Sequence, residues 1–406
     1  MKRLLLSIAV IALSAVWHPA PSAASDDDKE GRFKFGGSMR GRFEFFRFSE
    51  DETGAKEHTR GRIRYRFRLD GKIKVNNRAN FQFRLVSGND SRSGNQTLGD
   101  PVDFGPNIVA IRSAMMVLTP WPDGKLPDDR GYWRFDFGRT KNSFVWKGHG
   151  KDMMLWDGDI ALAGVGTQFG HQIGSPASFW INTGYYVIDE NGSGPKDPFM
   201  APVQTGFLFG GDNVNAGIRG SYWYMTELDS LFIQRGVDGE GGVTTSGGNI
   251  PDGLTGSVHG GTLKVVSTQA FVSAKAGRVP LTLFGGYSNN LTAEPSQIYP
   301  GIGKNAVAWN AGLEGGSKKK VIKLGLVWYY IEANAFPSQY IDSDFLDGHT
   351  NRYGPLFYLS KQVMKKTDFN TQIFWSDAIE TDNDGYGVSA RASERTRVQI
   401  DLLYHF

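Results

Sequence analysis

Four arginines alternate with apolar residues in the segment RGRIRYRFRLD, which spans residues 60–70. Arg62, Arg64, Arg66 and Arg68 fall at every second position, so an extended chain places all four on one face. A guanidinium stays charged and presents donors that match the oxygens of carboxylates and phosphates. The spacing therefore predicts a basic surface that attracts anions, provided that the segment is a strand whose second face meets water.

Motifs typical of enzymes are not found in the sequence. There is no phosphate-binding loop, no paired-histidine metal spacing and no nucleophile elbow, and the histidines are scattered along the chain. The segment Asp382–Gly385 is similar to the start of a calcium loop, but Arg391 stands where a bidentate glutamate is needed. The sequence has no cysteine. We expect no catalytic residue, no metal and no cofactor.

The first residues are typical of an export signal. Lys2 and Arg3 precede an apolar run that ends at Val16, and small residues follow at Ser22, Ala23 and Ala24. The run is shorter than the roughly 20 residues that a spanning helix needs. We predict that residues 1–24 are a secretory signal peptide and exclude them from the fold.

The last residues indicate an amphipathic strand. Val398, Ile400, Leu402, Tyr404 and Phe406 alternate with mostly polar neighbours. Such an ending is similar to the terminal strand of outer-membrane barrels, in which a final aromatic residue is recognised by the assembly machinery. We interpret Tyr404 and Phe406 as this assembly signal.

The same alternation recurs along the rest of the chain, with turn signals between segments. Mean hydropathy is −0.35, and 52 glycines with 13% aromatic residues favour turns and strands over helices. We predict an all-β fold, a transmembrane antiparallel up-and-down barrel of about sixteen strands that occupies residues 25–406. Short periplasmic turns should alternate with long extracellular loops. The expected strands start near residues 33, 60, 78, 108, 131, 160, 177, 202, 214, 262, 279, 304, 320, 353, 368 and 391.

A soluble β-sandwich would also show alternation, but it would bury one face of every strand. Here the second face of residues 60–70 carries four arginines and Asp70. Burying five charges on one strand would cost several kcal/mol for each unless they were paired. A water-filled lumen avoids this cost, and a closed sheet satisfies every backbone group in lipid. The segment near residue 262 changes its phase of alternation, which a bulge or a mispaired segment would explain.

Closing the barrel would join the first and last strands and assemble one basic wall from both chain ends. Arginine-lined pores favour anions, although nearby carboxylates would neutralise part of the charge. The residues expected to line this wall are Arg40, Arg42, Arg62, Arg64, Arg66, Arg68, Arg84, Arg395 and Arg397.

The loop at residues 141–159 differs from the others because it contains bulky apolar side chains among its charges. Such a loop should fold inward against the barrel or pack on a neighbouring subunit, since its apolar groups would otherwise face water. Folding inward would narrow the lumen and place acidic groups opposite the basic wall. The charged residues of this expected constriction are Lys147, Lys151, Asp152, Asp157 and Asp159.

The chain resembles the bacterial putative porins, which are sixteen-stranded outer-membrane channels with an arginine-rich start. The resemblance is carried by RGRIRYRFRLDGKIKVN (residues 60–76), FQFRLVSGND (81–90), NQTLGD (95–100), FGRTKNSF (137–144) and LWDGD (155–159). It implies passive diffusion of hydrophilic solutes and assembly as a homotrimer. Looser similarity exists to phosphate-selective porins and to an alginate-exporter-like barrel.

Other functions are compatible with such a barrel. An outer-membrane lipase or protease would need a histidine beside a serine or aspartate at one rim, and a polysaccharide export conduit would share the arginine-rich strands. The formal net charge is only +3, which indicates no nucleic-acid partner. The expected partners are outer-membrane lipid, the barrel-assembly machinery and small hydrophilic solutes, chiefly anions.

Overall fold

The structure is a computed structural model of the full-length chain. It describes residues 32–50, 56–88, 90, 92–99, 108–146, 148–153, 155–190, 197–228, 249, 261–277, 279–297, 303–344, 348–379 and 394–406. The predicted signal peptide at residues 1–24 lies outside these ranges.

Strands account for nearly all the regular structure of the described residues, together with two short 3₁₀ turns, Pro122–Gly124 and Ser338–Tyr340. The strands are β1 (Phe33–Glu50), β2 (Lys56–Lys74), β3 (Ala79–Ser87), β4 (Gln96–Thr97), β5 (Val109–Leu118), β6 (Gly131–Lys141), β7 (Ala161–Gly174), β8 (Ala177–Val187), β9 (Phe199–Gly210), β10 (Val214–Thr226), β11 (Leu263–Ala276), β12 (Val279–Asn290), β13 (Val307–Gly316), β14 (Lys323–Ile331), β15 (Arg352–Met364), β16 (Thr367–Ala378) and β17 (Arg395–His405).

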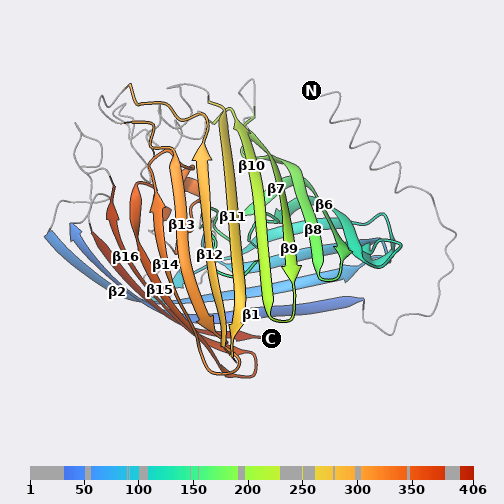
Figure 1. The fold of residues 1–406 in the computed structure, drawn as a ribbon, viewed down its shortest axis with the longest axis horizontal. Helices are drawn as coiled ribbons and strands as arrows, with labels where there is room; N and C mark the ends of the chain where they lie inside the picture. The colour runs from blue at the N-terminus through green and yellow to red at the C-terminus, as the bar shows by residue number, and fades with distance from the viewer. Residues whose placement is uncertain are drawn as a thin grey trace.

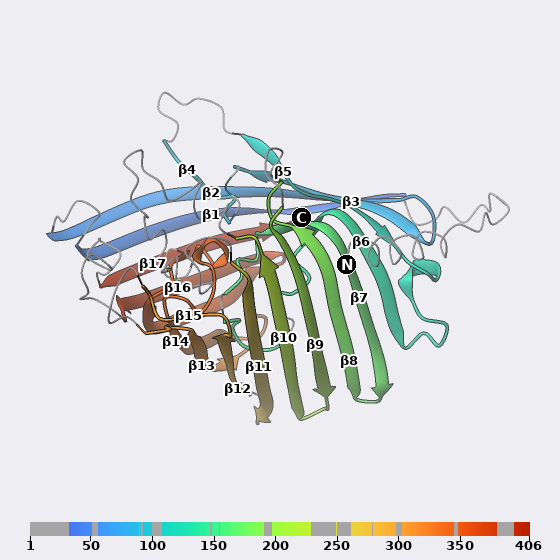
Figure 2. The ribbon, with the colours of Figure 1, turned by 90° about the horizontal axis from the view of Figure 1, so that it is seen from above.

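The strands form one closed antiparallel barrel. Each long strand pairs with its neighbours in sequence, and β1 pairs with both β2 and β17, which closes the ring. The two-residue β4 pairs only with β2, so sixteen of the seventeen strands make the wall. Figure 2 shows the blue first strands lying beside the red last strands. The predicted fold class and the predicted number of strands are confirmed.

Connections of two lengths separate the strands. In Figure 1, β9 is joined to β10 and β11 is joined to β12 by short connections at the lower end of the barrel. We call this end the short-turn end. The β7–β8 connection there consists of residues 175–176, whereas the β6–β7 connection at the opposite end, the long-loop end, spans residues 142–160. This alternation is the pattern expected from the sequence.

The two faces of each strand meet different surroundings. Ile63, Leu313 and Leu326 point outward and are more than half exposed, whereas Arg66 and Glu44 point inward and are buried. An apolar outer surface would be unfavourable in water but favourable in a bilayer. The inward faces of the sixteen strands therefore enclose the lumen.

The sequence located most strands to within a few residues, but two details differ. The short strand β4 was not anticipated. No bulge explains the phase change near residue 262, because the pairing of β11 with β10 and β12 is continuous. Instead, Leu263 and Val265 point inward and are fully buried, while Val266 and Val272 point outward. This strand is apolar on both faces because its inner face contacts a loop inside the barrel.

Among the described residues, no helix has both the length and the apolar character needed to cross a bilayer.

Candidate functional site

Arginines from the first two strands face each other across the inner wall. The β1–β2 register pairs Arg40 with Arg66 and Arg42 with Arg64, and it pairs Glu44 with Arg62. Like charges placed directly opposite each other in a sheet are destabilising. Two successive arginine pairs therefore need counter-ions from elsewhere in the fold.

The last strand supplies the first counter-ion and a further arginine. The Arg42 guanidinium donates two hydrogen bonds to Asp401, from Nε to Oδ1 at 2.6 Å and from Nη2 to Oδ2 at 2.7 Å. Arg397 Nη2 donates to Glu44 Oε1 at 2.6 Å, and Arg62 Nε donates to Glu44 Oε2 at 2.5 Å. The side chains of Arg42 and Glu44 are fully buried. Closure of the barrel thus joins the predicted basic residues of both chain ends into one wall.

Loops supply further counter-ions. Asp159, from the β6–β7 loop, accepts a hydrogen bond from Arg68 and lies 3.6 Å from Arg66 Nη1. Asp344, from the β14–β15 loop, accepts a hydrogen bond from Arg42 Nη1 at 2.6 Å. Asn95, just before β4, accepts one from Arg40 Nη2 at 2.5 Å. These loop residues contact the wall directly instead of facing it across a gap.

Two of the predicted wall residues have other partners. Arg84 forms a two-pronged ion pair with Asp70, with N–O distances of 2.8 and 2.9 Å. The Arg395 guanidinium lies 4.6 Å from the centre of the Phe48 ring, which favours a cation–π interaction. Arg84 is therefore neutralised within the lumen, whereas Arg395 lies farther toward the long-loop end.

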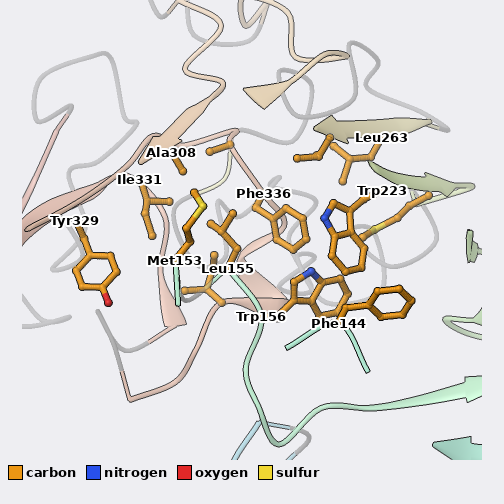
Figure 3. Close-up of a cluster of buried hydrophobic side chains, with 14 of the residues drawn as sticks. Phe144, Met153, Leu155, Trp156, Trp223, Leu263, Ala308, Tyr329, Ile331 and Phe336 are labelled. Carbon is orange, nitrogen blue, oxygen red and sulfur yellow. The ribbon is translucent and has the colours of Figure 1, made fainter. Parts of the chain in front are cut away.

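The β6–β7 loop lies against the inside of the wall. Phe144, Met153, Leu155 and Trp156 are buried in one cluster with inward side chains of β9–β16. Figure 3 shows these loop side chains facing Trp223, Leu263, Ala308, Tyr329, Ile331 and Phe336. The apolar groups of the loop thus replace water as the neighbour of an apolar stretch of the wall.

Polar contacts fix the same loop in place. Asp152 Oδ1 accepts a hydrogen bond from Arg219 Nη2 of β10 at 2.9 Å, and the Phe144 carbonyl accepts another from Arg219 Nη1 at 2.8 Å. Lys151 Nζ donates to Gln372 Oε1 at 3.4 Å and lies 4.9 Å from the centre of the Tyr358 ring. Lys147 lies outside the described residues. The loop therefore has charged anchors on opposite sides, at Arg219 and at Arg68.

A second loop, residues 332–351 between β14 and β15, also enters the barrel. Its residues Phe336 and Ile341 are fully buried. The Tyr340 ring stacks on Trp156 with a centroid distance of 4.7 Å, and Ser343 N donates to Asp157 Oδ2 at 2.9 Å. The two inward loops therefore meet at Asp157 and stabilise each other through these contacts.

Sequence reasoning missed this second loop. The signal was available, because Ala333, Ala335, Phe336 and Ile341 form the same kind of apolar concentration in a polar loop. It also missed Arg219, although the alternation of β10 places that side chain inward beside Ser221 and Trp223.

The carboxyl groups of Asp157, Asp342 and Asp344 lie near this junction and differ in pKa. Burial raises the pKa of Asp157 to about 6. Burial, with the neighbouring Asp157 and Asp344, raises the pKa of Asp342 well above its usual range. Burial also opposes ionisation of Asp344, but Arg42, Arg40 and Arg397 outweigh it and lower the pKa of that carboxyl well below its usual range. Asp344 thus has the lowest pKa of these three carboxyl groups, because it alone of the three lies against the arginines.

Residues 32–218 match the model of a family described as putative porin. The match covers a little less than half of the chain. This match confirms the resemblance to the putative porins that was found in the sequence. No curated protein matches the chain.

Solved structures share the barrel at low sequence identity. OprB of Pseudomonas putida, in a high-pH structure, is 12% identical, with a TM-score of 0.54, and the match covers 92% of this chain and 94% of that one. OmpF of Salmonella typhi in complex with daunomycin is 10% identical, with a TM-score of 0.48 and coverage of 92% and 97%. The outer-membrane channel DcaP of Acinetobacter baumannii is 10% identical, with a TM-score of 0.46 and coverage of 92% and 97%.

Cavities lie on both sides of the junction of the two loops. One, of about 210 Å³, lies toward the long-loop end and is bordered by Trp156, Tyr340 and Arg139. The other, of about 460 Å³, lies toward the short-turn end and is bordered by mainly polar side chains that include Lys72 and Gln82. The inward loops thus separate a largely apolar space toward the long-loop end from a polar space toward the short-turn end.

Phe406 extends the contact between the first and last strands, β1 and β17. Phe406 N donates to the Gly37 carbonyl and Gly37 N donates to the Phe406 carbonyl, each at 3.2 Å. The Phe406 ring stacks on Phe67 with a centroid distance of 6.3 Å, and it lies 6.4 Å from the Tyr404 ring. Both of these terminal aromatic side chains face outward and are nearly half exposed.

Proposed function

We propose that this chain is an outer-membrane porin, a water-filled channel for passive diffusion of small hydrophilic solutes, and that its arginine wall makes it prefer anions. Residues 1–24 act as the export signal in this proposal, and residues 25–406 form the barrel. Tyr404 and Phe406 serve as the signal for the barrel-assembly machinery. The mature protein assembles as a homotrimer and binds no nucleic acid.

The single observation that carries anion preference is the excess of positive charge on the wall. Among the described residues, Arg40, Arg42, Arg62, Arg64 and Arg397 form one contact network with three carboxylates, which belong to Glu44, Asp344 and Asp401. Five positive charges against three negative charges leave a net charge of +2. Charge lining a narrow passage raises the local concentration of the opposite ion.

The reversal potential of the refolded barrel in a KCl gradient tests this function. An open channel with a reversal potential on the chloride side is expected. Replacing Arg62, Arg64 and Arg66 with glutamine should move the potential toward zero, since the wall would lose three charges. Arg78→Gln combined with Arg130→Gln is the control, because these arginines lie exposed at the short-turn end. Unchanged selectivity in the triple variant would contradict the role of the wall.

Two other functions remain distinguishable by experiment. Two histidines contact carboxylates in the described part of the chain, His171 with Asp128 and His405 with Asp368. Both lie near the short-turn end. Hydrolysis of lipid or peptide by a non-conducting barrel would favour a lipase or protease, whereas passage of polysaccharide would favour an export conduit.

A further inference from the structure

The carboxylate of Asp344 comes from the β14–β15 loop and lies against the arginine wall. Its Oδ1 accepts a hydrogen bond from Arg42 Nη1 at 2.6 Å and another from Gln399 Nε2 at 3.2 Å. The same oxygen lies 3.7 Å from Arg397 Nη2, and Oδ2 lies 4.0 Å from Arg40 Nη1. Four donor groups from β1 and β17 thus surround one carboxylate that comes from a loop.

The donors are held in place without help from the Asp344 side chain. Asp401 binds Arg42 through two hydrogen bonds from the neighbouring strand, and Glu44 binds both Arg397 and Gln399. The Arg42 side chain is fully buried, and that of Arg397 is 6% exposed. Groups with so little freedom lose little entropy on binding a ligand, so the cluster is preorganised for a carboxylate.

The loop is also held without help from Asp344. Asn249 Nδ2 donates to the carbonyls of Ala333 and Phe336 at 2.6 and 2.8 Å. Arg92 Nη1 donates to the carbonyls of Ser338 and Gly348 at 2.9 and 3.2 Å. Removing the Asp344 carboxylate is therefore expected to vacate the donor cluster while the loop stays packed in the barrel.

The carboxylate end of the cluster is open to the lumen. The Asp344 side chain is 25% exposed, whereas the arginine side chains that bind it are 8% exposed or less. Solvent therefore reaches the bound carboxylate more easily than the donors behind it. A solute that arrives from the lumen would meet Asp344 first and would have to replace it to reach Arg42.

We propose that Arg40, Arg42, Arg397 and Gln399 form a binding site for the carboxylate group of a permeating solute, and that Asp344 occupies this site in the solute's absence. Asp344 then acts as an internal competitor that keeps solute affinity low, so that the solute binds and leaves. The wall keeps a positive charge when Asp344 is present, which favours the approach of an anion. This inference rests on the proposed channel function and names its solute class.

A carboxylate fits the site better than other anions. The ligand that the protein itself provides is a carboxylate, and planar guanidinium groups match its two oxygens. A chloride ion is a single atom, so it cannot occupy at once the two positions at which the carboxylate oxygens of Asp344 meet Arg42 and Arg40. Phosphate presents more oxygens and more charge, so its binding distinguishes a carboxylate site from a general oxyanion site.

Succinate binding to the refolded full-length barrel, measured by titration calorimetry, tests the inference without any current. Asp344→Asn and Asp344→Ala should each bind succinate at least tenfold more tightly than the wild type. Asp344→Glu restores a competing carboxylate and should return the affinity toward that of the wild type. Asp70→Asn is the matched control, because it removes another lumen carboxylate that pairs with an arginine, Arg84, and it should leave succinate affinity unchanged.

Single-channel recording separates this inference from the proposed function. Succinate should block chloride current through Asp344→Asn at lower concentration than through the wild type. If the Asp344 variants still prefer anions but bind succinate no more tightly than the wild type, the proposed binding site is wrong. The proposed porin function is not affected by that result. Equal tightening for phosphate and succinate would overturn the assignment to carboxylates. A wild-type channel that shows no anion preference but still binds succinate would contradict the proposed function alone.

Discussion

Arg42 and Asp401 face each other across the seam of the barrel, 359 residues apart in sequence, and form a two-pronged ion pair. Their Cα atoms are register partners in the β1–β17 pairing. Both side chains are buried, at 0% and 7% exposure. The contact therefore fixes the register in which the first strand meets the last.

Asp401→Asn should destabilise the folded barrel by about 3 kcal/mol, because removing one partner of a buried pair leaves the other charge poorly compensated. Arg42 still contacts Asp344 and Glu44 in this variant. The expected destabilisation is therefore at the lower end of the range for broken buried ion pairs. The free energy of unfolding in urea is the measurement.

Asp70→Asn provides the comparison for that variant. Asp70 makes the same two-pronged contact with Arg84, but the two side chains are 32% and 24% exposed. Exposed pairs contribute about 1 kcal/mol or less. Equal destabilisation by the two substitutions would show that the seam pair has no special role in closure.

Gly37→Ala should reduce the yield of folded barrel. A Cβ atom at position 37 would lie 2.2 Å from the Arg68 carbonyl oxygen and 2.5 Å from Phe406 Cζ, so the terminal ring and the β1–β2 pairing would both have to shift. Gly41→Ala is the matched control on the same face of β1, since nothing lies within 4 Å of its Cβ position. The folded fraction after refolding into detergent, read by circular dichroism, should fall only for Gly37→Ala.

Deletion of Phe406 should slow barrel assembly in cells and lower the amount at the surface. The deletion removes both the backbone hydrogen bonds to Gly37 and the ring that stacks on Phe67. Leu402→Ala removes an exposed apolar side chain of the same strand and should have a smaller effect. Surface levels measured by labelling intact cells provide the test, and normal levels without Phe406 would argue against its role as an assembly signal.

Loop packing at Asp157 should weaken as pH rises. Burial raises the pKa of Asp157 to about 6, so between about pH 4 and pH 6 the packed loop holds a proton that a released loop would lose. Stability of the packed state is therefore greatest below this window and falls as pH rises through it. The rise in the pKa of Asp157 corresponds to about 3 kcal/mol of stability of the packed loop relative to the released loop.

Current fluctuations of single channels report on this equilibrium. They should increase from pH 4 to pH 7 in the wild type, and Asp157→Asn should flatten that dependence although Asp342, Asp344 and Asp159 remain nearby. Asp212→Asn, in an exposed turn between β9 and β10, should keep the wild-type profile. An unchanged profile in Asp157→Asn would assign the dependence to another group.

Alternation in the sequence was enough to predict the barrel and the inward direction of the arginines. Ile63, Tyr65 and Phe67 alternate with arginines, and a period of two puts the two sets on opposite faces of any strand. The apolar residues of the β6–β7 loop also indicated an inward fold, since the alternative was to expose them to water.

The partners of those arginines could not be predicted in the same way. Asp344 is separated from Arg42 by 302 residues, and Asp401 by 359, so no local spacing relates them. Which carboxylate meets which arginine depends on the strand register and on the path of the loops inside the barrel.

The sequence by itself thus determined what each strand presents to its two faces, because side-chain direction in a strand follows from position alone. Only the tertiary structure decided that two loops meet inside the lumen at Asp157, and that Asp344 takes the place of a ligand on the wall. The physical reason is that these contacts are made between segments distant in sequence. Closure of the barrel and burial of apolar loop residues bring them together.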